Sequence, residues 1–396
     1  MMTPEKPPFL LIEACDFVEV PAGGQLSFAK SLAHSCPDDF RLVGVAREGE
    51  PVGEWITRRI GERELPFYAF DHATHYRAKG WLPMRLRSTI SLARHIGRLR
   101  ACGARGVFLQ APELLFAIRS GSFQSLCMCF AGAENPLLYS RYRIGRWLAP
   151  VFMRLLRWQI RKADVVLASA DSAACKSLGD RIGRGIKALP TSFDETVFFP
   201  HDEQRTVRHE LGVAQDEPMF VAVGRISTVK GWRLLLEAFS SYRAVTARGR
   251  LVFVGDGEDR VALEAAAAEI GVAEHVSITG MRTPAQVRMI VSAATAVLFG
   301  SHIEGFSVAM LEALGCGANI VCTEVSGARD LVRDGRNGFV LENRDPVAFG
   351  ERMRQSESFP RPNPVSLDIA VTYTTARLRT RLADVWPPFA LDVQRG

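Results

Sequence analysis

Short apolar segments alternate with longer helical patterns along the chain, and this alternation constrains the fold more than any other feature of the sequence. In the first half the apolar segments are residues 9–14, 41–45, 107–110, 126–130 and 164–168. In the second half they are residues 219–223, 251–254, 276–279, 296–299 and 319–323, with helical patterns at residues 231–242, 258–270, 284–293 and 306–314. Strands that alternate with helices predict an α/β fold whose parallel sheets are covered by helices on both faces.

Polar and proline-marked stretches divide this rhythm into parts. The predicted linker, a second break and the last helical pattern lie at residues 190–218, 360–364 and 367–385, respectively. A chain of 396 residues is too long for a single core. We therefore predict an N-terminal domain at residues 1–200 and a C-terminal domain at residues 201–364, with residues 365–396 packing back on the first domain. In open α/β folds, ligands bind at the carboxyl ends of the strands.

The most informative cluster follows the apolar segment at 296–299. Glu304 lies in a predicted loop, Ser307 is placed to cap a helix, and Glu312 lies inside that helix. A spacing of about two helical turns lets both carboxylates address one crevice from different depths. The amide groups of a helix start favour a phosphate, and a deeper carboxylate can accept hydrogen bonds from hydroxyls. Taken alone, both acids are equally well read as solvated surface residues.

A pair of cations forms the second cluster. The segment at 219–223 ends in Gly224-Arg225, and Lys230 precedes the next helical pattern. Arginine can bind phosphate oxygens with two parallel hydrogen bonds, and lysine adds a point charge. Two fixed cations suit a diphosphate whose negative charge grows as it leaves. The alternative is two ordinary surface cations around a turn.

Other motifs carry weaker information. Gly255-Asp256-Gly257 forms a turn after a strand, and Gly23-Gly24 follows the first strand, where a glycine pair lets the backbone approach a phosphate. No complete GxGxxG motif is present, which argues against a dinucleotide-binding domain. No DxD motif indicates a magnesium site, and the eight cysteines show no zinc-like spacing. We therefore expect neither a cofactor nor a metal.

In order and spacing, these clusters resemble the GT4-type glycosyltransferases of the GT-B fold, the glycosyl transferases group 1. The matching residues are Gly23-Gly24, Ala163-Asp164-Val165, Gly224-Arg225, Lys230-Gly231, Gly255-Asp256-Gly257, Glu304, Glu312, Cys316-Gly317, Gly327 and Asn337-Gly338-Phe339. The resemblance covers most of the chain and is strongest from residue 219 to residue 341. It implies a GT-B fold with two Rossmann-like domains whose parallel sheets face each other across a cleft.

The resemblance also implies an activity and a set of site residues. The activity is transfer of a sugar from a nucleotide-diphosphate sugar to a hydroxyl acceptor, without a metal and with retention of anomeric configuration. Arg225, Lys230 and Glu304 form the implied catalytic set, the cations on the diphosphate and the acid on the transferred sugar. The implied donor-binding residues are Gly23, Gly24, Gly224, Gly255, Met281, Gly305, Phe306, Ser307 and Glu312, with Glu312 on the ribose.

Two departures from the family pattern affect the acceptor side. Many relatives carry a histidine near the donor sugar, but residues 129–136 contain none, and Glu134 or Asn135 can take its place as acceptor residues. Residues 191–194 replace the usual Asn-Gly-Val-Asp. Two other functions stay open, namely a nucleotide-sugar epimerase of the same fold and an inactive subunit that binds donor.

The net charge of +6 is concentrated in the first half of the chain. Arginine and tryptophan recur in residues 76–100 and 139–162. Two interpretations fit equally well: these segments are helices that dock on an anionic membrane, or they are helices that pack on the core and leave their arginines in solvent. The expected partners are a UDP- or GDP-sugar and a saccharide or lipid-linked saccharide acceptor, but not nucleic acid. The sequence shows no signal-peptide pattern and no membrane-spanning run, so we expect a cytoplasmic enzyme that can also bind peripherally to the inner face of the membrane. The expected pathway is bacterial exopolysaccharide, lipopolysaccharide or glycolipid assembly.

Overall fold

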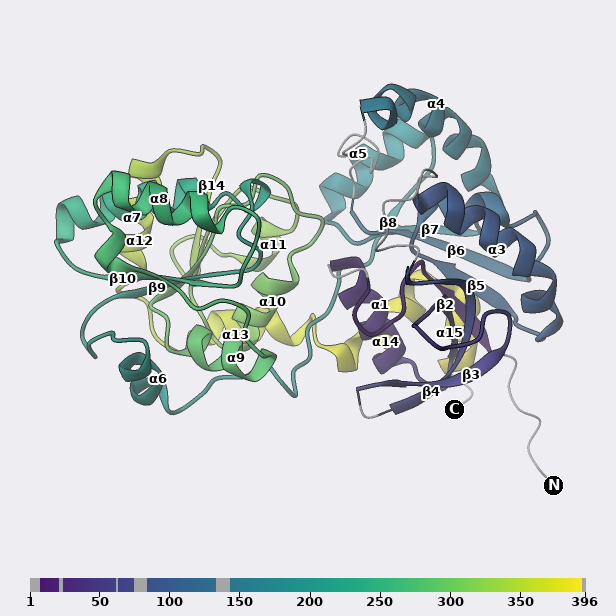
Figure 1. Cartoon of the computed structure of the whole chain (residues 1–396), viewed down its shortest axis with the longest axis horizontal. Coiled ribbons are helices and arrows are strands. Elements are labelled where there is room, and N and C mark those ends of the chain that lie inside the picture. The colour runs from purple at the N-terminus through teal and green to yellow at the C-terminus, as the bar shows by residue number, and fades with distance from the viewer. Residues whose placement is uncertain (1–7, 21–23, 62, 75–83, 133–142, 394–396) are drawn as a thin grey trace. The chain divides into compact units, whose positions relative to one another are not determined.

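A computed structural model of the chain describes residues 8–20, 24–61, 63–74, 84–132 and 143–393. The chain forms two compact units, each containing one sheet (Figure 1). Unit 1 comprises Met1–Thr191 and Thr375–Gly396, and unit 2 comprises Ser192–Thr374. These divisions fall about ten residues from the boundaries expected from the sequence, at 200 and 364.

Unit 1 is built on an eight-stranded sheet with the order β3-β4-β2-β1-β5-β6-β7-β8. Its strands are β1 (Phe9–Ile12), β2 (Phe40–Ala46), β3 (Trp55–Ile60), β4 (Arg63–His72), β5 (Gly106–Leu109), β6 (Ser125–Phe130), β7 (Val165–Ala168) and β8 (Lys187–Ala188). All neighbours pair in parallel except β3 and β4, which form an antiparallel hairpin at the sheet edge. The sequence analysis did not anticipate this hairpin.

Helices cover both faces of this sheet. They are α1 (Gly24–Ser35), α3 (Met84–Ala101), η1 (Pro112–Ala117), α4 (Arg143–Gln159), η2 (Ile160–Lys162), α5 (Ser172–Ile182), α14 (Thr375–Val385) and α15 (Pro387–Val393). The two C-terminal helices belong to this unit because Trp386 is fully buried, stacks edge-on against Phe9 at 4.8 Å and donates a hydrogen bond to Ser125 Oγ at 2.9 Å.

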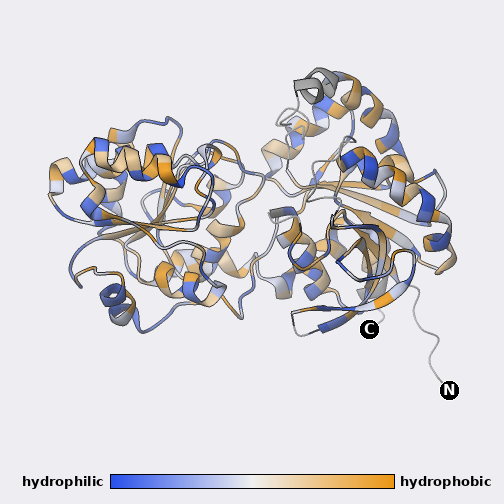
Figure 2. Cartoon of the chain, in the orientation of Figure 1, coloured by the Kyte–Doolittle hydropathy of each residue, from blue (hydrophilic) through white to orange (hydrophobic). Residues whose placement is uncertain are grey.

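Unit 2 contains a six-stranded, wholly parallel sheet with the order β11-β10-β9-β12-β13-β14. Its strands are β9 (Met219–Val223), β10 (Arg250–Val254), β11 (Val276–Ile278), β12 (Ala296–Phe299), β13 (Ile320–Thr323) and β14 (Gly338–Leu341). Its helices are α6 (Gln204–Glu210), η3 (Thr228–Lys230), α7 (Trp232–Thr246), α8 (Arg260–Ile270), η4 (Ala273–His275), α9 (Pro284–Ser292), α10 (Val308–Gly315), α11 (Ala328–Leu331), α12 (Pro346–Ser356) and α13 (Pro364–Val371). The strands are apolar along nearly their whole length (Figure 2), as expected for strands buried on both faces.

The helix expected across residues 367–385 is wrong, because the structure contains two helices there. The first, α13, belongs to unit 2, where Ala370 is buried and Tyr373 packs against Phe306 with their rings 5.4 Å apart. The amide of Phe193 donates to the carbonyl oxygen of Tyr373 at 3.1 Å, so the chain leaves the helical path before α14 begins in unit 1. Among the described residues, no helix has both the length and the apolar character needed to cross a bilayer.

Candidate functional site

The carboxyl ends of β9, β10 and β12 bring three loops of unit 2 together. Gly224, after β9, has φ +135° and donates its amide hydrogen to the carbonyl oxygen of Val254 at 3.0 Å. A Cβ atom on Gly255 would lie 2.1 Å from the carbonyl oxygen of Gly224, so only glycine allows this approach. The tight contact fixes the backbone from which Arg225 projects.

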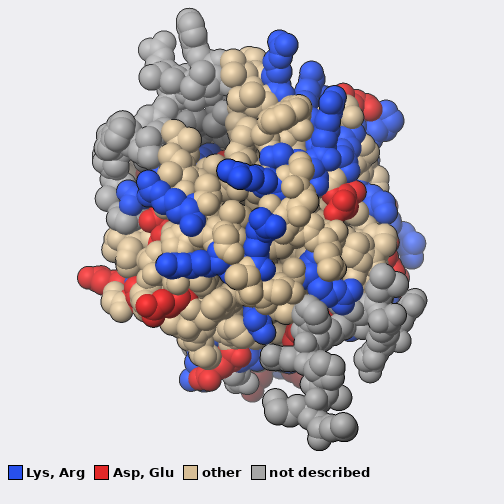
Figure 3. Space-filling model, turned by 90° about the vertical axis from the view of Figure 1, so that its right-hand side faces the viewer, with Lys and Arg blue, Asp and Glu red and all other residues tan. Residues whose placement is uncertain are grey.

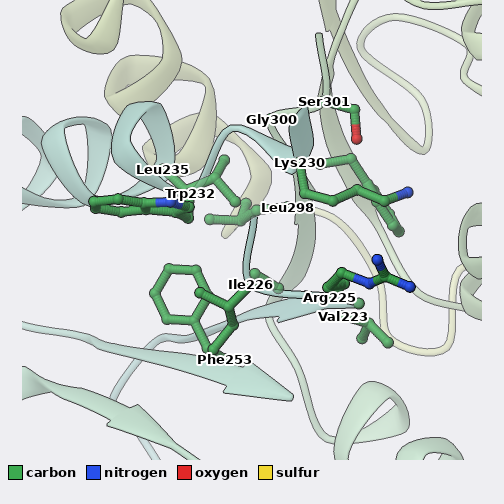
Figure 4. Close-up of a pocket in the computed structure, with 13 residues that line it drawn as sticks. Val223, Arg225, Ile226, Lys230, Trp232, Leu235, Phe253, Leu298, Gly300 and Ser301 are labelled. Carbon is green, nitrogen blue, oxygen red and sulfur yellow. The ribbon is translucent and has the colours of Figure 1, made fainter. Parts of the chain in front are cut away.

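These loops line a pocket at the strand ends (Figure 4). Its lining residues are Ala222, Val223, Gly224, Arg225, Ile226, Lys230, Trp232, Leu235, Phe253, Leu298, Phe299, Gly300 and Ser301. The charged ends of Arg225 and Lys230 point to the same side of the pocket as the Ser301 hydroxyl, whereas Trp232 and Leu235 lie on the opposite side. The pocket therefore has a cationic side and an apolar side.

Lys230 and Glu304 form an ion pair at this site. Lys230 Nζ lies 2.6 Å from Glu304 Oε1, and the Ser301 hydroxyl donates to the same oxygen at 2.7 Å. The Glu304 side chain is 13% exposed and that of Lys230 39% exposed. The fold thus brings together two of the residues that the sequence analysis assigned to catalysis, although they are 74 positions apart.

Arg225 differs from Lys230 because none of the described residues pairs with it. It is exposed, and among the described residues no hydrogen bond or ion pair engages its guanidinium group. Arg225 lies beside the paired Lys230 at the carboxyl ends of parallel strands. It is therefore available to an anionic ligand.

The start of α10 offers further donors to such a ligand. Ser307 caps the helix, as expected, and its hydroxyl accepts a hydrogen bond from the amide of Met310. Within the described part of the chain, the amides of Gly305 and Phe306 donate no hydrogen bond. The Phe306 ring is buried against Tyr373, which anchors this loop. Free amides just ahead of a helix start favour a phosphate or a carboxylate.

Glu312 lies in the middle of α10. Its carboxyl group is largely shielded from water, and this burial raises its pKa to about 7. No hydrogen bond or ion pair to the carboxyl group is present among the described residues. A carboxylate without a partner costs free energy when buried, and hydroxyl donors on a ligand would offset that cost.

The remaining predicted site residues are more scattered. Met281 is 79% exposed and follows Gly280, which forms an isolated antiparallel bridge with Gly255. Gly24 is the first residue of α1 in unit 1. Gly23, Glu134 and Asn135 lie outside the described residues, so their predicted roles stay predictions. Across the described parts of the chain, no group of three His, Cys, Asp or Glu side chains could hold a metal ion.

The sequence analysis missed three polar residues near strand ends. Arg344 donates to the carbonyl oxygens of Gly300 at 2.8 Å and Ser301 at 3.1 Å. Asp259 accepts from Thr228 Oγ1 at 2.7 Å and from Trp232 Nε1 at 3.0 Å; these hydrogen bonds lower its pKa and steady the turn that carries Lys230. No local motif predicts the role of either residue, because both form hydrogen bonds with loops that are far away in the sequence.

The third missed residue, Glu13, follows β1 in unit 1 and is 3% exposed. Burial raises its pKa to about 8. Gln25 Nε2 lies 3.0 Å from both of its carboxyl oxygens, and the amide of Ala14 donates to one of them at 2.8 Å. The protein itself therefore supplies the partners of this acid.

Comparison with known proteins links this site to a family. Residues 203–363 match the family model of glycosyl transferases group 1. The chain is 31% identical over 208 residues to a D-inositol 3-phosphate glycosyltransferase of Acidothermus cellulolyticus, covering 48% of this chain and 46% of the relative. It is 29% identical over 220 residues to a GDP-mannose-dependent alpha-(1-6)-phosphatidylinositol monomannoside mannosyltransferase of Mycolicibacterium smegmatis, covering 52% and 56%. The chain thus spans about half the length of these curated relatives.

A solved structure supports the fold over nearly the whole chain. The structure of Anabaena HepE in complex with UDP superimposes with a TM-score of 0.72 at 17% identity, covering 96% of this chain and all of that one. We conclude that the chain has the GT-B fold and that its residues 203–363 are similar to the glycosyl transferases group 1.

Proposed function

We propose that the chain is a retaining glycosyltransferase that moves a sugar from a nucleotide-diphosphate sugar to a hydroxyl group of an acceptor. The observation that carries this proposal is a set of polar groups without hydrogen-bond or ion-pair partners near the carboxyl ends of the unit 2 strands. In the part of the chain that the structure describes, Arg225 has no anionic partner, the amides of Gly305 and Phe306 have no acceptors, and the Glu312 carboxyl group has no donors. A nucleoside diphosphate provides the anion and the hydroxyl donors that these groups lack.

In this mechanism the second unit stabilises the leaving group. Arg225 and Lys230 bind the diphosphate oxygens, on which negative charge grows as the bond to the sugar breaks. A lysine ammonium has three donors, so Lys230 can keep Glu304 and bind a phosphate oxygen at the same time. The amides of Gly305 and Phe306 add hydrogen bonds to the anion. Ionised Glu312 accepts hydrogen bonds from the ribose hydroxyls.

The transfer step needs no covalent intermediate on the protein. The acceptor hydroxyl oxygen forms a new bond to the anomeric carbon on the face from which the diphosphate leaves. The bond between that carbon and the diphosphate oxygen breaks, and a diphosphate oxygen takes the acceptor proton. Glu304, held by Lys230 and Ser301, contacts the sugar during this exchange.

The donor class can be tested without knowing the acceptor. UDP, GDP, ADP and TDP are added separately, and the thermal unfolding of the chain is followed. A nucleotide at a hundred times its dissociation constant should stabilise the protein by about 2.7 kcal/mol. We expect this for UDP or GDP, and calorimetric titration of that nucleotide should give one site per chain. Absence of binding by all four nucleotides would refute the proposal.

We further propose that the enzyme works at the inner membrane face, on a saccharide or lipid-linked saccharide, in bacterial polysaccharide or glycolipid assembly. The support lies on α4 of unit 1, where Val151, Leu155 and Trp158 are 50–62% exposed. The exposed Arg154 and Arg157 lie on the same helix, and the exposed Arg161 follows in η2. Figure 3 views the molecule from the side of α3 and α4 and shows that lysine and arginine gather on this face. Exposed apolar residues within a basic surface favour an anionic bilayer.

Vesicle co-sedimentation tests the membrane proposal separately. The chain should bind vesicles containing phosphatidylglycerol but not pure phosphatidylcholine, and salt should weaken the binding. Replacing Leu155 and Trp158 by alanine should abolish it. The matched control replaces Val245 and Val261 of unit 2, which are 76% and 77% exposed. If the wild-type chain does not bind anionic vesicles, the membrane proposal fails. The proposal for the donor site does not depend on this result.

A further inference from the structure

Arg344 reaches from the loop after β14 to the loop that carries Glu304. Its Nη2 donates to the carbonyl oxygen of Gly300 at 2.8 Å, and its Nη1 donates to that of Ser301 at 3.1 Å. We propose that Arg344 is a positioning residue for the donor site, which orients Ser301 and through it Glu304. This inference rests on the proposed function for its role in sugar binding, but its structural part does not.

Both carbonyl groups follow the last residue of β12, where the pairing with β13 has ended. Ser301 is 2% exposed, so water cannot satisfy its carbonyl group. Thr323 Oγ1 also donates to the carbonyl oxygen of Ser301, at 2.7 Å. The planar guanidinium fork can serve two successive carbonyl groups at once, which a lysine ammonium does less well. Arg344 thereby fixes the direction in which the backbone turns after the strand.

The same backbone is in close contact with the turn that carries Lys230. A Cβ atom on Gly231 would lie 1.7 Å from the carbonyl oxygen of Gly300 and 2.7 Å from Arg344 Nη2. The amide of His302 donates to the carbonyl oxygen of Val229 at 2.8 Å. The Lys230 turn and the Glu304 loop are therefore joined through backbone atoms, and the Arg344 side chain braces the junction.

This arrangement transmits the position of Arg344 to the ion pair. The backbone at Ser301 places the Ser301 hydroxyl, which donates to Glu304 Oε1, and that oxygen contacts Lys230 Nζ. Without Arg344, the loop loses two charge-assisted hydrogen bonds, and the Ser301 hydroxyl holds Glu304 toward Lys230 less firmly. The sugar contact of Glu304 should weaken, whereas Arg225 and Glu312, which Arg344 does not contact, should keep binding the nucleoside diphosphate.

The first test needs no ligand. Hydrogen–deuterium exchange is measured on the full chain for the wild type, for Arg344→Met and for Arg336→Met, which removes an exposed arginine of the same unit. Arg344→Met should accelerate amide exchange across residues 300–305 and leave β9 unchanged, whereas Arg336→Met should alter neither. Unchanged exchange in residues 300–305 of Arg344→Met would overturn the inference. If Arg344→Met fails to fold, Arg344→Lys takes its place.

The second test measures how much the sugar adds to donor affinity. Calorimetry compares UDP-glucose with UDP and GDP-mannose with GDP for each variant. Arg344→Met should lose about tenfold in affinity for the nucleotide sugar, about the contribution of one charge-assisted hydrogen bond, and keep its affinity for the nucleoside diphosphate. Glu304→Gln should show the same pattern, and Arg344→Lys should recover part of the loss. Equal losses for both ligands, or no loss, would overturn the inference. If the wild type binds neither ligand, the donor proposal fails while the exchange test still decides the structural part.

Discussion

One glutamate in each unit has a pKa raised by burial, and the two acids differ in their surroundings: Glu13 of unit 1 is buried, and Glu312 of unit 2 is half-buried. Burial raises the pKa of Glu13 in unit 1 to about 8 and that of Glu312 in unit 2 to about 7. Glu13 receives hydrogen bonds from Gln25 and Ala14, whereas the carboxyl group of Glu312 has none among the described residues. A buried acid with partners is part of the fold. A buried acid without partners points to a ligand that supplies them.

The cations repeat the contrast. Arg58 of unit 1 pairs with Glu50, Arg87 lies 3.2 Å from Asp71, and Arg85 lies 2.9 Å from Glu113. In unit 2, Arg225 lacks such a partner within the described structure. Lys230 of unit 2 is itself paired with Glu304, so the contrast rests on Arg225. It supports the proposal that Arg225 binds the donor diphosphate, whereas the paired arginines of unit 1 stabilise the fold.

Removing Lys230 should have the largest effect on nucleotide binding. Lys230→Ala deletes a phosphate ligand and leaves the Glu304 charge next to the diphosphate, so affinity for UDP or GDP should fall about a hundredfold, or about 2.7 kcal/mol. Titration calorimetry measures the loss. The double variant Lys230→Ala/Glu304→Gln should bind better than Lys230→Ala, because it lacks that repulsion. The matched control in unit 1 is Arg87→Ala, which should bind nucleotide normally; wild-type affinity in Lys230→Ala would contradict the assignment.

A smaller effect is expected when the acid of α10 is removed. Glu312→Ala loses the acceptor for the ribose hydroxyls, and nucleoside diphosphate affinity should fall about tenfold. Inorganic pyrophosphate has no ribose, so its affinity should be nearly unchanged. Both ligands are titrated into both proteins at one pH. Equal losses would show that Glu312 does not contact the ribose.

The pKa of Glu312 adds a pH dependence to donor binding. In the free protein the neutral carboxyl is favoured, so the stability it contributes is complete below pH 4.5 and is lost as the pH rises through about 7. Hydroxyl donors favour the ionised form, so affinity should rise by up to about tenfold between pH 6 and pH 8. UDP-glucose or GDP-mannose is the appropriate ligand, since its diphosphate does not titrate there. Glu312→Gln should flatten the profile, and a slope that persists would assign the pH dependence elsewhere.

The corresponding change in unit 1 should not affect nucleotide binding at all. The pKa of Glu13 is also raised, so its contribution to stability is lost as the pH rises from 4.5 through about 8, by up to about 1.4 kcal/mol per pH unit. Glu13→Gln keeps a neutral polar group there, and the variant should be more stable than the wild type at pH 9. Urea unfolding at several pH values checks this. A loss of nucleotide affinity in Glu13→Gln would break the contrast between the units.

Much of the frame could be predicted because strong local patterns encode it. Buried parallel strands are apolar throughout, as in β9 and β12, and Ser307 announces a helix start by its position before an apolar run. The β3–β4 hairpin was not predicted, because β3 lies at the edge of the sheet and contains both charged and apolar residues. The helix at 367–385 was overextended because the turn between α13 and α14 depends on Phe193, far away in the sequence.

The candidate site shows the same division. The contact between Lys230 and Glu304 agrees with their assignment to one site, which rested on residue type, spacing and the family resemblance. The chemical roles of Arg225, Lys230, Glu304 and Glu312 stay predictions. The support of the Lys230 turn by Asp259 and the support of Ser301 by Arg344 could not be predicted, because their hydrogen bonds join residues 27 or more positions apart and follow no local motif. That no described residue pairs with Arg225 is a property of the folded surface, which the sequence alone does not show.

The central claim is that a donor diphosphate binds to unit 2, between the two cations and the start of α10. A crystal structure of the chain with UDP or GDP tests it most directly. Phosphate oxygens should lie within hydrogen-bonding distance of Arg225, Lys230 and the amides of Gly305 and Phe306, and the ribose hydroxyls should contact Glu312. A nucleotide bound elsewhere, with these groups contacting only solvent, would contradict it.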